Sequence, residues 1–142
     1  MIKYLTKKFD LNDDDILWEN FTSFLRNIIP YEEATFNSLL ETQKTAVVVF
    51  IYSSEVMGDG HMSFFELYGN YISSLMVMDA LKKTSVSDAY IKILEKLPKD
   101  ATTSPDSYDD LDALFYQYGN DEIIDKIIFY VRQHHLDFFE YI

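Results

Sequence analysis

An apolar stripe at helical spacing occupies the C-terminal segment and constrains the fold more than any other feature of the sequence. Its members recur at intervals that follow the helical repeat: Ile123, Ile124, Ile127, Ile128, Val131, His135, Phe138 and Phe139. A period near 3.6 residues places these side chains on one face of a helix, and such a face must be buried against other elements. The pattern therefore predicts a final helix that packs on a helical core.

A second helix is predicted near the N-terminus, over residues 13–29. Asn12 is a helix-capping residue type, and the three aspartates that follow it suit the positive end of a helix dipole. Further along, the stretch TAVVVFIY (45–52) is β-branched and aromatic, which by itself is typical of a buried strand. No turn signal interrupts residues 32–56, so we expect one long helix there.

Glycines mark the expected joints between helices. They are Gly58, Gly60, Gly69 and Gly119. Glycine readily adopts the left-handed conformation that ends many helices, and the asparagine that follows each of the last two can cap the next helix. In the segment GDGHMSFFELYGN (58–70) we expect a tight turn at the first two glycines, with Phe64, Phe65 and Leu67 filling the core.

The rest of the chain fits the same helical scheme. Ser85 with Asp88 forms a capping-box variant that opens a helix over 89–97, and residues 99–107 read as a polar loop before a helix that starts at Ser107. We predict an all-α fold with six to seven helices in a single domain, residues 1–142. Within it, the 13–29 helix packs on a core formed by residues 31–142.

No pattern in the sequence indicates catalysis, a cofactor or a metal. Asp59 lacks the alternating acids of a calcium loop, and His61 has no second histidine or cysteine at metal-ligand spacing. His134 and His135 are adjacent, so they point in different directions on a helix. The chain contains no cysteine and no recognisable Ser-His-Asp arrangement. We expect a binding protein and not an enzyme.

The charge of the chain narrows the class of partner. The formal net charge is −12, and the window from Asp100 to Asp125 holds eight acids with no lysine or arginine. Such a surface repels nucleic acid and anionic lipid and attracts basic proteins. The longest apolar run is seven residues, Ala46 to Tyr52, which is too short for a membrane span. We expect a cytoplasmic protein that binds neither membranes nor nucleic acid directly.

Seven of the eight acids of this window are the predicted partner-binding residues. They are Asp106, Asp109, Asp110, Asp112, Asp121, Glu122 and Asp125. Acids in the first turn stabilise a helix, which by itself explains where many of them lie. Acids three or four positions apart on a helix are also about 5–6 Å apart, close to the repeat of phosphates along a nucleic-acid strand. The window therefore fits either helix capping or imitation of a nucleic-acid backbone.

The segment EVMGDGHMSFFELYGN (55–70) resembles the hallmark of a bacterial family, the DNA mimic protein nineteen-like domain. The shared positions are Glu55, Val56, Gly60, Phe64, Phe65 and Gly69. The resemblance continues through the expected helices at 71–81 and 87–97 to LDALFYQY and IIDKIIFYVRQHHLDFF, and covers residues 39–139. Most polar positions of the hallmark differ, since Met57 and Gly58 replace two asparagines and His61 replaces an apolar aromatic residue.

This resemblance implies an all-α fold and supports a helix at 45–52. The name of the family implies an acidic dimer that occupies the DNA-binding surface of a transcription factor. We therefore expect binding to a basic, nucleic-acid-binding protein, with a homodimer as the implied assembly. The alternative is an immunity protein that neutralises a nuclease-type toxin, and a toxin gene beside the coding sequence would favour it.

Overall fold

The structure, a computed structural model, describes residues 2–28, 32–88, 90–91, 95 and 105–142, with the side chains of 105–107 and 120 left out. The described residues form seven helices and two short strands: β1 (Tyr4–Thr6), α1 (Asp14–Asn27), α2 (Glu33–Asn37), α3 (Glu41–Tyr68), α4 (Ser74–Lys83), α6 (Pro105–Tyr118), α7 (Asn120–Gln133), α8 (His135–Phe138) and β2 (Phe139–Tyr141). The fold is mostly helical, as predicted. Most of the expected helix at 89–97 and most of the expected loop at 99–107 lie outside the described residues.

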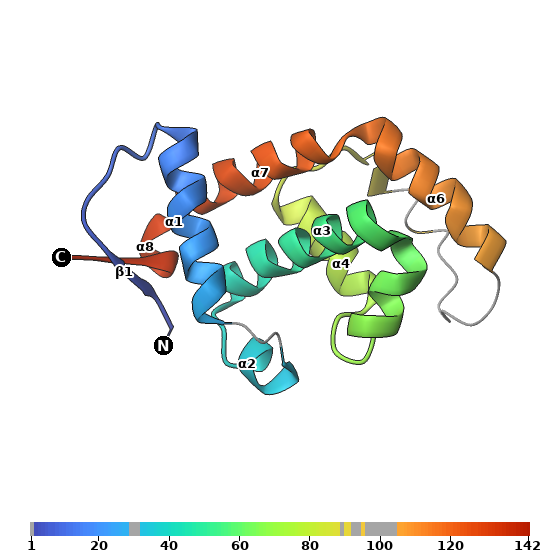
Figure 1. The fold of residues 1–142 in the computed structure, drawn as a ribbon, viewed down its shortest axis with the longest axis horizontal. Helices are drawn as coiled ribbons and strands as arrows, with labels where there is room; N and C mark the ends of the chain where they lie inside the picture. The colour runs from blue at the N-terminus through green and yellow to red at the C-terminus, as the bar shows by residue number, and fades with distance from the viewer. Residues whose placement is uncertain (1, 29–31, 89, 92–94, 96–104) are drawn as a thin grey trace.

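Helix α3 runs through the centre of the molecule and contacts α4, α6, α7 and α8 (Figure 1). The β-branched stretch 45–52 is helical, as predicted. The expected single helix over 32–56 is wrong, because α2 ends at Asn37 and α3 begins only at Glu41. The reason is local: Leu40 has extended backbone angles, and its N–H donates to the side-chain oxygen of Gln43, which caps the new helix.

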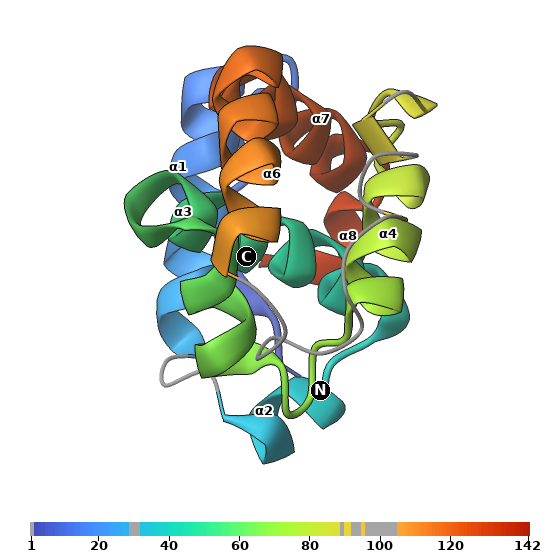
Figure 2. The same cartoon turned by 90° about the vertical axis from the view of Figure 1, so that its right-hand side faces the viewer.

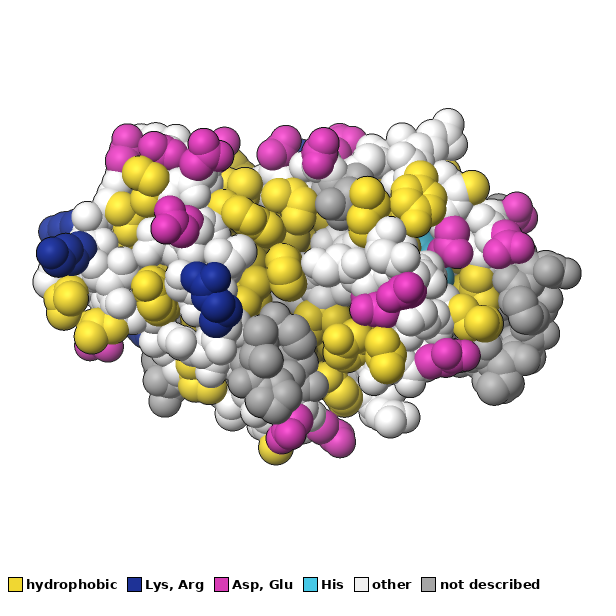
Figure 3. Space-filling model, viewed as in Figure 1, with side chains coloured by type: hydrophobic (Ala, Val, Ile, Leu, Met, Phe, Trp, Pro, Cys, Tyr) yellow, Lys and Arg dark blue, Asp and Glu magenta, His cyan; other side chains and the backbone are white. Residues whose placement is uncertain are grey.

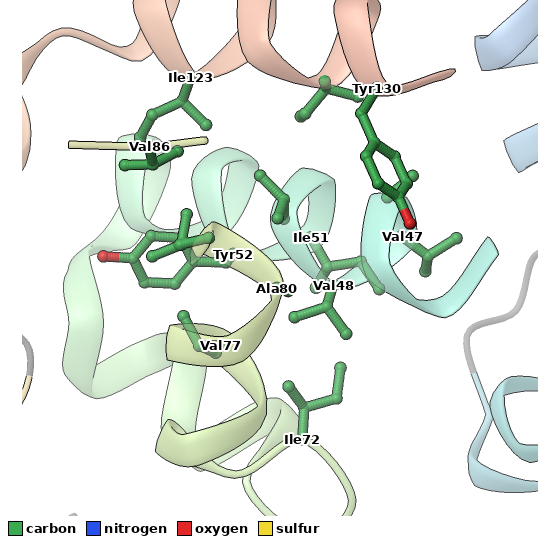
Figure 4. Close-up of a cluster of buried hydrophobic side chains, with 14 of the residues drawn as sticks. Val47, Val48, Ile51, Tyr52, Ile72, Val77, Ala80, Val86, Ile123 and Tyr130 are labelled. Carbon is green, nitrogen blue, oxygen red and sulfur yellow. The ribbon is translucent and has the colours of Figure 1, made fainter. Parts of the chain in front are cut away.

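The core is built on the buried face of α3. Aliphatic side chains of α3 meet Val77 and Ala80 of α4 and Ile123 and Tyr130 of α7 in one cluster (Figure 4). Tyr52 lies in the same cluster, with its hydroxyl directed away from the aliphatic side chains. Because the stretch 46–52 of α3 is covered on several sides, it is apolar nearly all round, which explains why this β-branched run looked like a strand.

The N-terminal helix α1 lies across one end of α3 (Figure 1). Asp13 caps it, accepting from the backbone N–H groups of Asp15 and Ile16, so the expected cap at Asn12 is off by one residue. Trp18 is only partly buried and packs on Phe50 with ring centroids 5.9 Å apart. Arg132 of α7 pairs with Asp14 and donates to the carbonyl of Leu11 at 2.6 Å, which ties α7 to the start of α1.

The two ends of the chain form a small parallel sheet that the sequence did not predict. Strand β1 pairs with β2, and Tyr4 lies opposite Phe139. The apolar stripe was expected to continue as one helix to Phe139, but α7 ends at Gln133 and the chain changes direction at His134. The short helix α8 follows, and from Phe139, which packs edge-on against Phe9 at 5.5 Å, the chain is a strand.

The glycine turns are partly as predicted. Gly60 (φ 86°) and Gly119 (φ 97°) have the expected left-handed φ, whereas Gly58 lies inside α3 and Gly69 ends it with an ordinary φ of −59°. Ser73, and not Asn70, caps α4 through the N–H of Met76, so that helix begins later than expected.

The expected filling of the core by this segment also differs in part. Phe64 is buried, Phe65 is half-buried, and Leu67 is 59% exposed. Only the first of these three side chains therefore fills the core as predicted.

Helices α6 and α7 follow one another along one edge of the molecule and bend at Gly119 (Figures 1 and 2). They do not lie side by side as an antiparallel pair. Helix α6 begins at Pro105, earlier than the expected start at Ser107, because proline is well suited to the first turn of a helix. Within the described residues, none of the helices is long and apolar enough to cross a membrane.

Candidate functional site

Five of the predicted acids are exposed on α6 and α7, and we call them the acidic edge: Asp109, Asp110, Asp121, Glu122 and Asp125. Figure 3 shows acidic side chains at intervals along the upper border of the molecule, over α1 and α7, and again at the end formed by α6. Asp106 belongs to α6 by its backbone, and its side chain lies outside the described residues.

The acidic edge is elongated. Asp109 and Asp110 lie on α6, and the other three acids lie on α7, the next helix along the same border. About one helix length therefore separates Asp109 from Asp121, roughly 18 Å at 1.5 Å per residue. Asp121 and Glu122 occupy the first turn of α7, where the helix dipole stabilises them. Asp109 and Asp110 lie beyond the first turn of α6, because that helix starts at Pro105.

Asp112 differs from the other predicted acids. Its side chain is only 27% exposed, and it points at the helix break of α3 and not into solvent. Its Oδ1 accepts two hydrogen bonds from His61, from the backbone N–H at 2.9 Å and from ring Nδ1 at 2.6 Å. Although the sequence groups Asp112 with the predicted partner-binding acids, its carboxylate is engaged in the packing of α6 on α3.

The break in α3 lies at Gly60, whose left-handed φ turns the following N–H away from the helix. In an uninterrupted helix the N–H of His61 would donate to the carbonyl of Met57, four residues earlier. Helix α6 supplies both missing partners: Asp112 accepts the N–H of His61, and the hydroxyl of Tyr116 donates to the carbonyl of Met57 at 3.0 Å. Asp112 and Tyr116 are one turn apart, and we call the pair the α6 clamp.

A chain of hydrogen bonds leads from the α6 clamp into the core. His61 Nε2 lies 2.7 Å from the hydroxyl of Tyr52, which in turn contacts the hydroxyl of Tyr90. His61, Tyr52 and Tyr90 are buried, while Asp112 reaches the surface. We call these four residues the buried chain. It joins both halves of α3, helix α6 and the segment at residue 90.

The directions of these hydrogen bonds follow from the donors and acceptors present. The carboxylate of Asp112 accepts, so Nδ1 of His61 carries a proton and donates. In the neutral ring Nε2 is then an acceptor for the hydroxyl of Tyr52, whose oxygen accepts from Tyr90. Every group of the buried chain is satisfied in this arrangement, which a buried polar cluster requires.

Burial governs the titration of the buried chain. Burial lowers the pKa of His61 below its ordinary value of 6.5, and the neighbouring Asp112 carboxylate opposes this effect. Burial likewise raises the pKa of Tyr52 and of Tyr90 above the ordinary tyrosine value. The ring of His61 is therefore neutral at pH 7, which agrees with the hydrogen-bond directions above.

The order carboxylate, histidine, hydroxyl resembles that of a nucleophilic triad, but its hydroxyl end is enclosed by the core. The oxygen of Tyr52 is held between His61 and Tyr90, and the ring of Phe115 packs edge-on against both Tyr52 and His61. A substrate has no access to that oxygen in this arrangement. Among the described residues, no group of three His, Cys, Asp or Glu side chains is placed to hold a metal ion.

The two glycines near the break give opposite predictions. Gly60→Ala places a Cβ 2.7 Å from Oδ2 of Asp112 on a backbone with left-handed φ, so we expect a loss of unfolding free energy of about 1 kcal/mol or more. Gly58→Ala adds a Cβ with nothing within 4 Å inside a helix, so we expect a gain of about 0.5–1 kcal/mol. Urea unfolding of both variants measures this. If both variants changed the unfolding free energy equally, the break would not depend on the left-handed φ of Gly60.

The fold and the acidic edge together define a class of protein: acidic, mostly helical, and with an elongated row of carboxylates on its surface. The chain belongs to the DMP19-like protein family, whose model matches residues 37–134. This match confirms the resemblance stated from the sequence. Neither the curated proteins nor the solved structures yield a significant match to the chain.

Proposed function

We propose that this protein is an acidic interaction module that binds a basic, nucleic-acid-binding protein by presenting carboxylates in place of phosphates. It acts by binding and not by catalysis. The observation that carries the proposal is the acidic edge, where exposed acids recur on two successive helices within a window that has no lysine or arginine. The family description agrees with a protein of the DNA-mimic type.

The start of α6 favours this function over helix capping alone. Asp121 and Glu122 lie in a first turn, so the helix dipole accounts for them without any partner. Asp109 and Asp110 lie beyond the first turn of α6, where the dipole effect has largely faded, and both are exposed. Helix stability therefore gives little reason for these two acids, whereas a basic partner does.

The decisive experiment neutralises the acidic edge without touching the α6 clamp. The variant carries Asp109→Asn, Asp110→Asn, Asp121→Asn and Glu122→Gln. A partner captured from the native host is purified, and its affinity for parent and variant is measured at several salt concentrations. We expect weaker binding by the variant and a shallower salt dependence, because fewer exposed charges are screened. Duplex DNA should compete with the parent for the partner.

A matched control removes the same number of negative charges from exposed positions outside the acidic edge. It replaces four other exposed acids: Glu19→Gln, Glu33→Gln, Glu66→Gln and Glu140→Gln. We expect it to bind nearly as well as the parent. Equal losses in both variants would show that only total charge matters, and unchanged binding by the edge variant would contradict the proposal.

A further inference from the structure

Two aromatic side chains are exposed on the helices that carry the acidic edge. Tyr116 on α6 is 54% exposed and Phe129 on α7 is 51% exposed, whereas every other Phe, Tyr and Trp of the described residues is buried or half-buried. Figure 3 shows exposed apolar side chains beside the acids over α7 and beside those at the end formed by α6. One exposed apolar side chain is ordinary, but both exposed rings lie on these two helices, which points to a shared role.

The two rings occupy equivalent positions relative to the acids. On each helix, one acid precedes the ring by seven residues and another precedes it by four. The two sets are Asp109, Asp112 and Tyr116 on α6, and Glu122, Asp125 and Phe129 on α7. Residues at these intervals lie on one face of a helix. Each helix therefore presents two acids and a ring in a row, which we call a carboxylate–ring stripe.

The ring of Tyr116 is held in place on the surface. Its hydroxyl donates to the carbonyl of Met57 at 3.0 Å, and its ring meets the ring of Phe115 edge-on at 6.0 Å. A side chain that is already positioned loses little conformational freedom when a partner binds. Phe129 has no polar group, so a side-chain hydrogen bond cannot account for its exposure.

The chemistry of a carboxylate–ring stripe favours an arginine side chain. A cation is attracted to the face of an aromatic ring, and a carboxylate one turn away adds a direct charge interaction. Arginine suits both at once, because its planar guanidinium stacks on a ring, pairs with a carboxylate and is weakly hydrated. The ammonium group of lysine is compact and strongly hydrated, so it gains less from the ring.

The charges along the chain differ between the two stripes. The α6 stripe lies wholly inside the window from Asp100 to Asp125, which has no lysine or arginine. On α7, Lys126 lies three residues before Phe129 and weakens the attraction for a cation there. The stripe that ends at Tyr116 is therefore the stronger of the two.

We propose that the two carboxylate–ring stripes are arginine-binding subsites, in which a guanidinium of the partner lies against the ring and pairs with the acids of the same stripe. The inference rests on the proposed function for the existence of a basic partner. It adds that the partner presents arginine at this surface and not merely positive charge. Proteins that bind nucleic acid rely on arginine for contacts with phosphates, so such a partner has the side chain that the stripes require.

The test compares octa-arginine with octa-lysine, two capped peptides of equal charge, by isothermal titration calorimetry. We expect the parent to bind octa-arginine about three- to tenfold more tightly. Tyr116→Phe and Tyr116→Leu are a matched pair, because both lose the hydrogen bond to Met57 and only the second loses the ring. We expect Tyr116→Phe to keep the preference for arginine, Tyr116→Leu to lose most of it, and Phe129→Leu to lose a smaller part.

Equal affinity of the parent for the two peptides would overturn the inference and leave the proposed function standing, since carboxylates alone would then bind either cation. The same preference in Tyr116→Leu and Tyr116→Phe would also overturn it. The proposed function fails separately if the edge variant, with its four neutralised acids, binds both peptides as tightly as the parent does.

A second measurement covers the case in which the Tyr116 variants do not fold. Aromatic carbon NMR of the parent then decides, because octa-arginine should shift the ring signals of Tyr116 and Phe129 more than octa-lysine does. Equal shifts with the two peptides would reject the inference.

Discussion

Phe64→Ala is expected to lower the free energy of unfolding by about 3–5 kcal/mol, which is a large share of the roughly 5–15 kcal/mol that stabilises an ordinary domain. The side chain is fully buried just beyond the break in α3. Its ring packs edge-on against Tyr52 at 5.4 Å and Phe65 at 5.0 Å, so its removal leaves a cavity beside the buried chain. Urea or thermal unfolding measures the loss.

Phe65→Ala is the matched control, since it removes the same atoms from the adjacent position. Phe65 is only partly buried, so we expect a loss of about 1–2 kcal/mol. The difference between the two variants tests the orientation of the helix segment after Gly60. Equal losses, or a larger loss for Phe65→Ala, would mean that this segment is rotated relative to the structure described above.

Sequence patterns predicted the elements whose signal is local. The stripes of α1 and α7 repeat at helical spacing within their own segments, so periodicity was sufficient to find both helices. The stretch 45–52 was ambiguous, because a helix buried on several sides loses the polar face that distinguishes it from a buried strand. There the length of the uninterrupted segment and the family resemblance favoured a helix, and the structure agrees.

Element boundaries were less predictable, because neighbouring polar residues compete for the same cap. Asp13 caps α1 although Asn12 is an equally good residue type, and Ser73 caps α4 although Asn70 follows the glycine. The two-stranded sheet had no local signal at all, since its strands of three residues come from opposite ends of the chain. Such pairings are decided by tertiary packing.

The buried chain was the feature most hidden from sequence reasoning. Residue spacing tests His61 only as a metal ligand, and the charge of its window groups Asp112 with the other predicted partner-binding acids. The two residues are 51 positions apart, so no spacing rule brings them together. The one available clue was Gly60, because a left-handed break in a long helix leaves backbone groups that another element must satisfy.

Asp112→Ala is expected to lower the free energy of unfolding by about 2–4 kcal/mol, because it leaves the backbone N–H and the ring Nδ1 of His61 buried without an acceptor. Asp109→Ala is the matched control on the same helix, and its exposed side chain should change stability by no more than about 0.5 kcal/mol. Urea unfolding of both variants at pH 7.5 separates an acid that holds the fold from one that is free to meet a partner. If Asp112→Ala were as mild as Asp109→Ala, the α6 clamp would contribute nothing to stability and Asp112 would belong with the acidic edge after all.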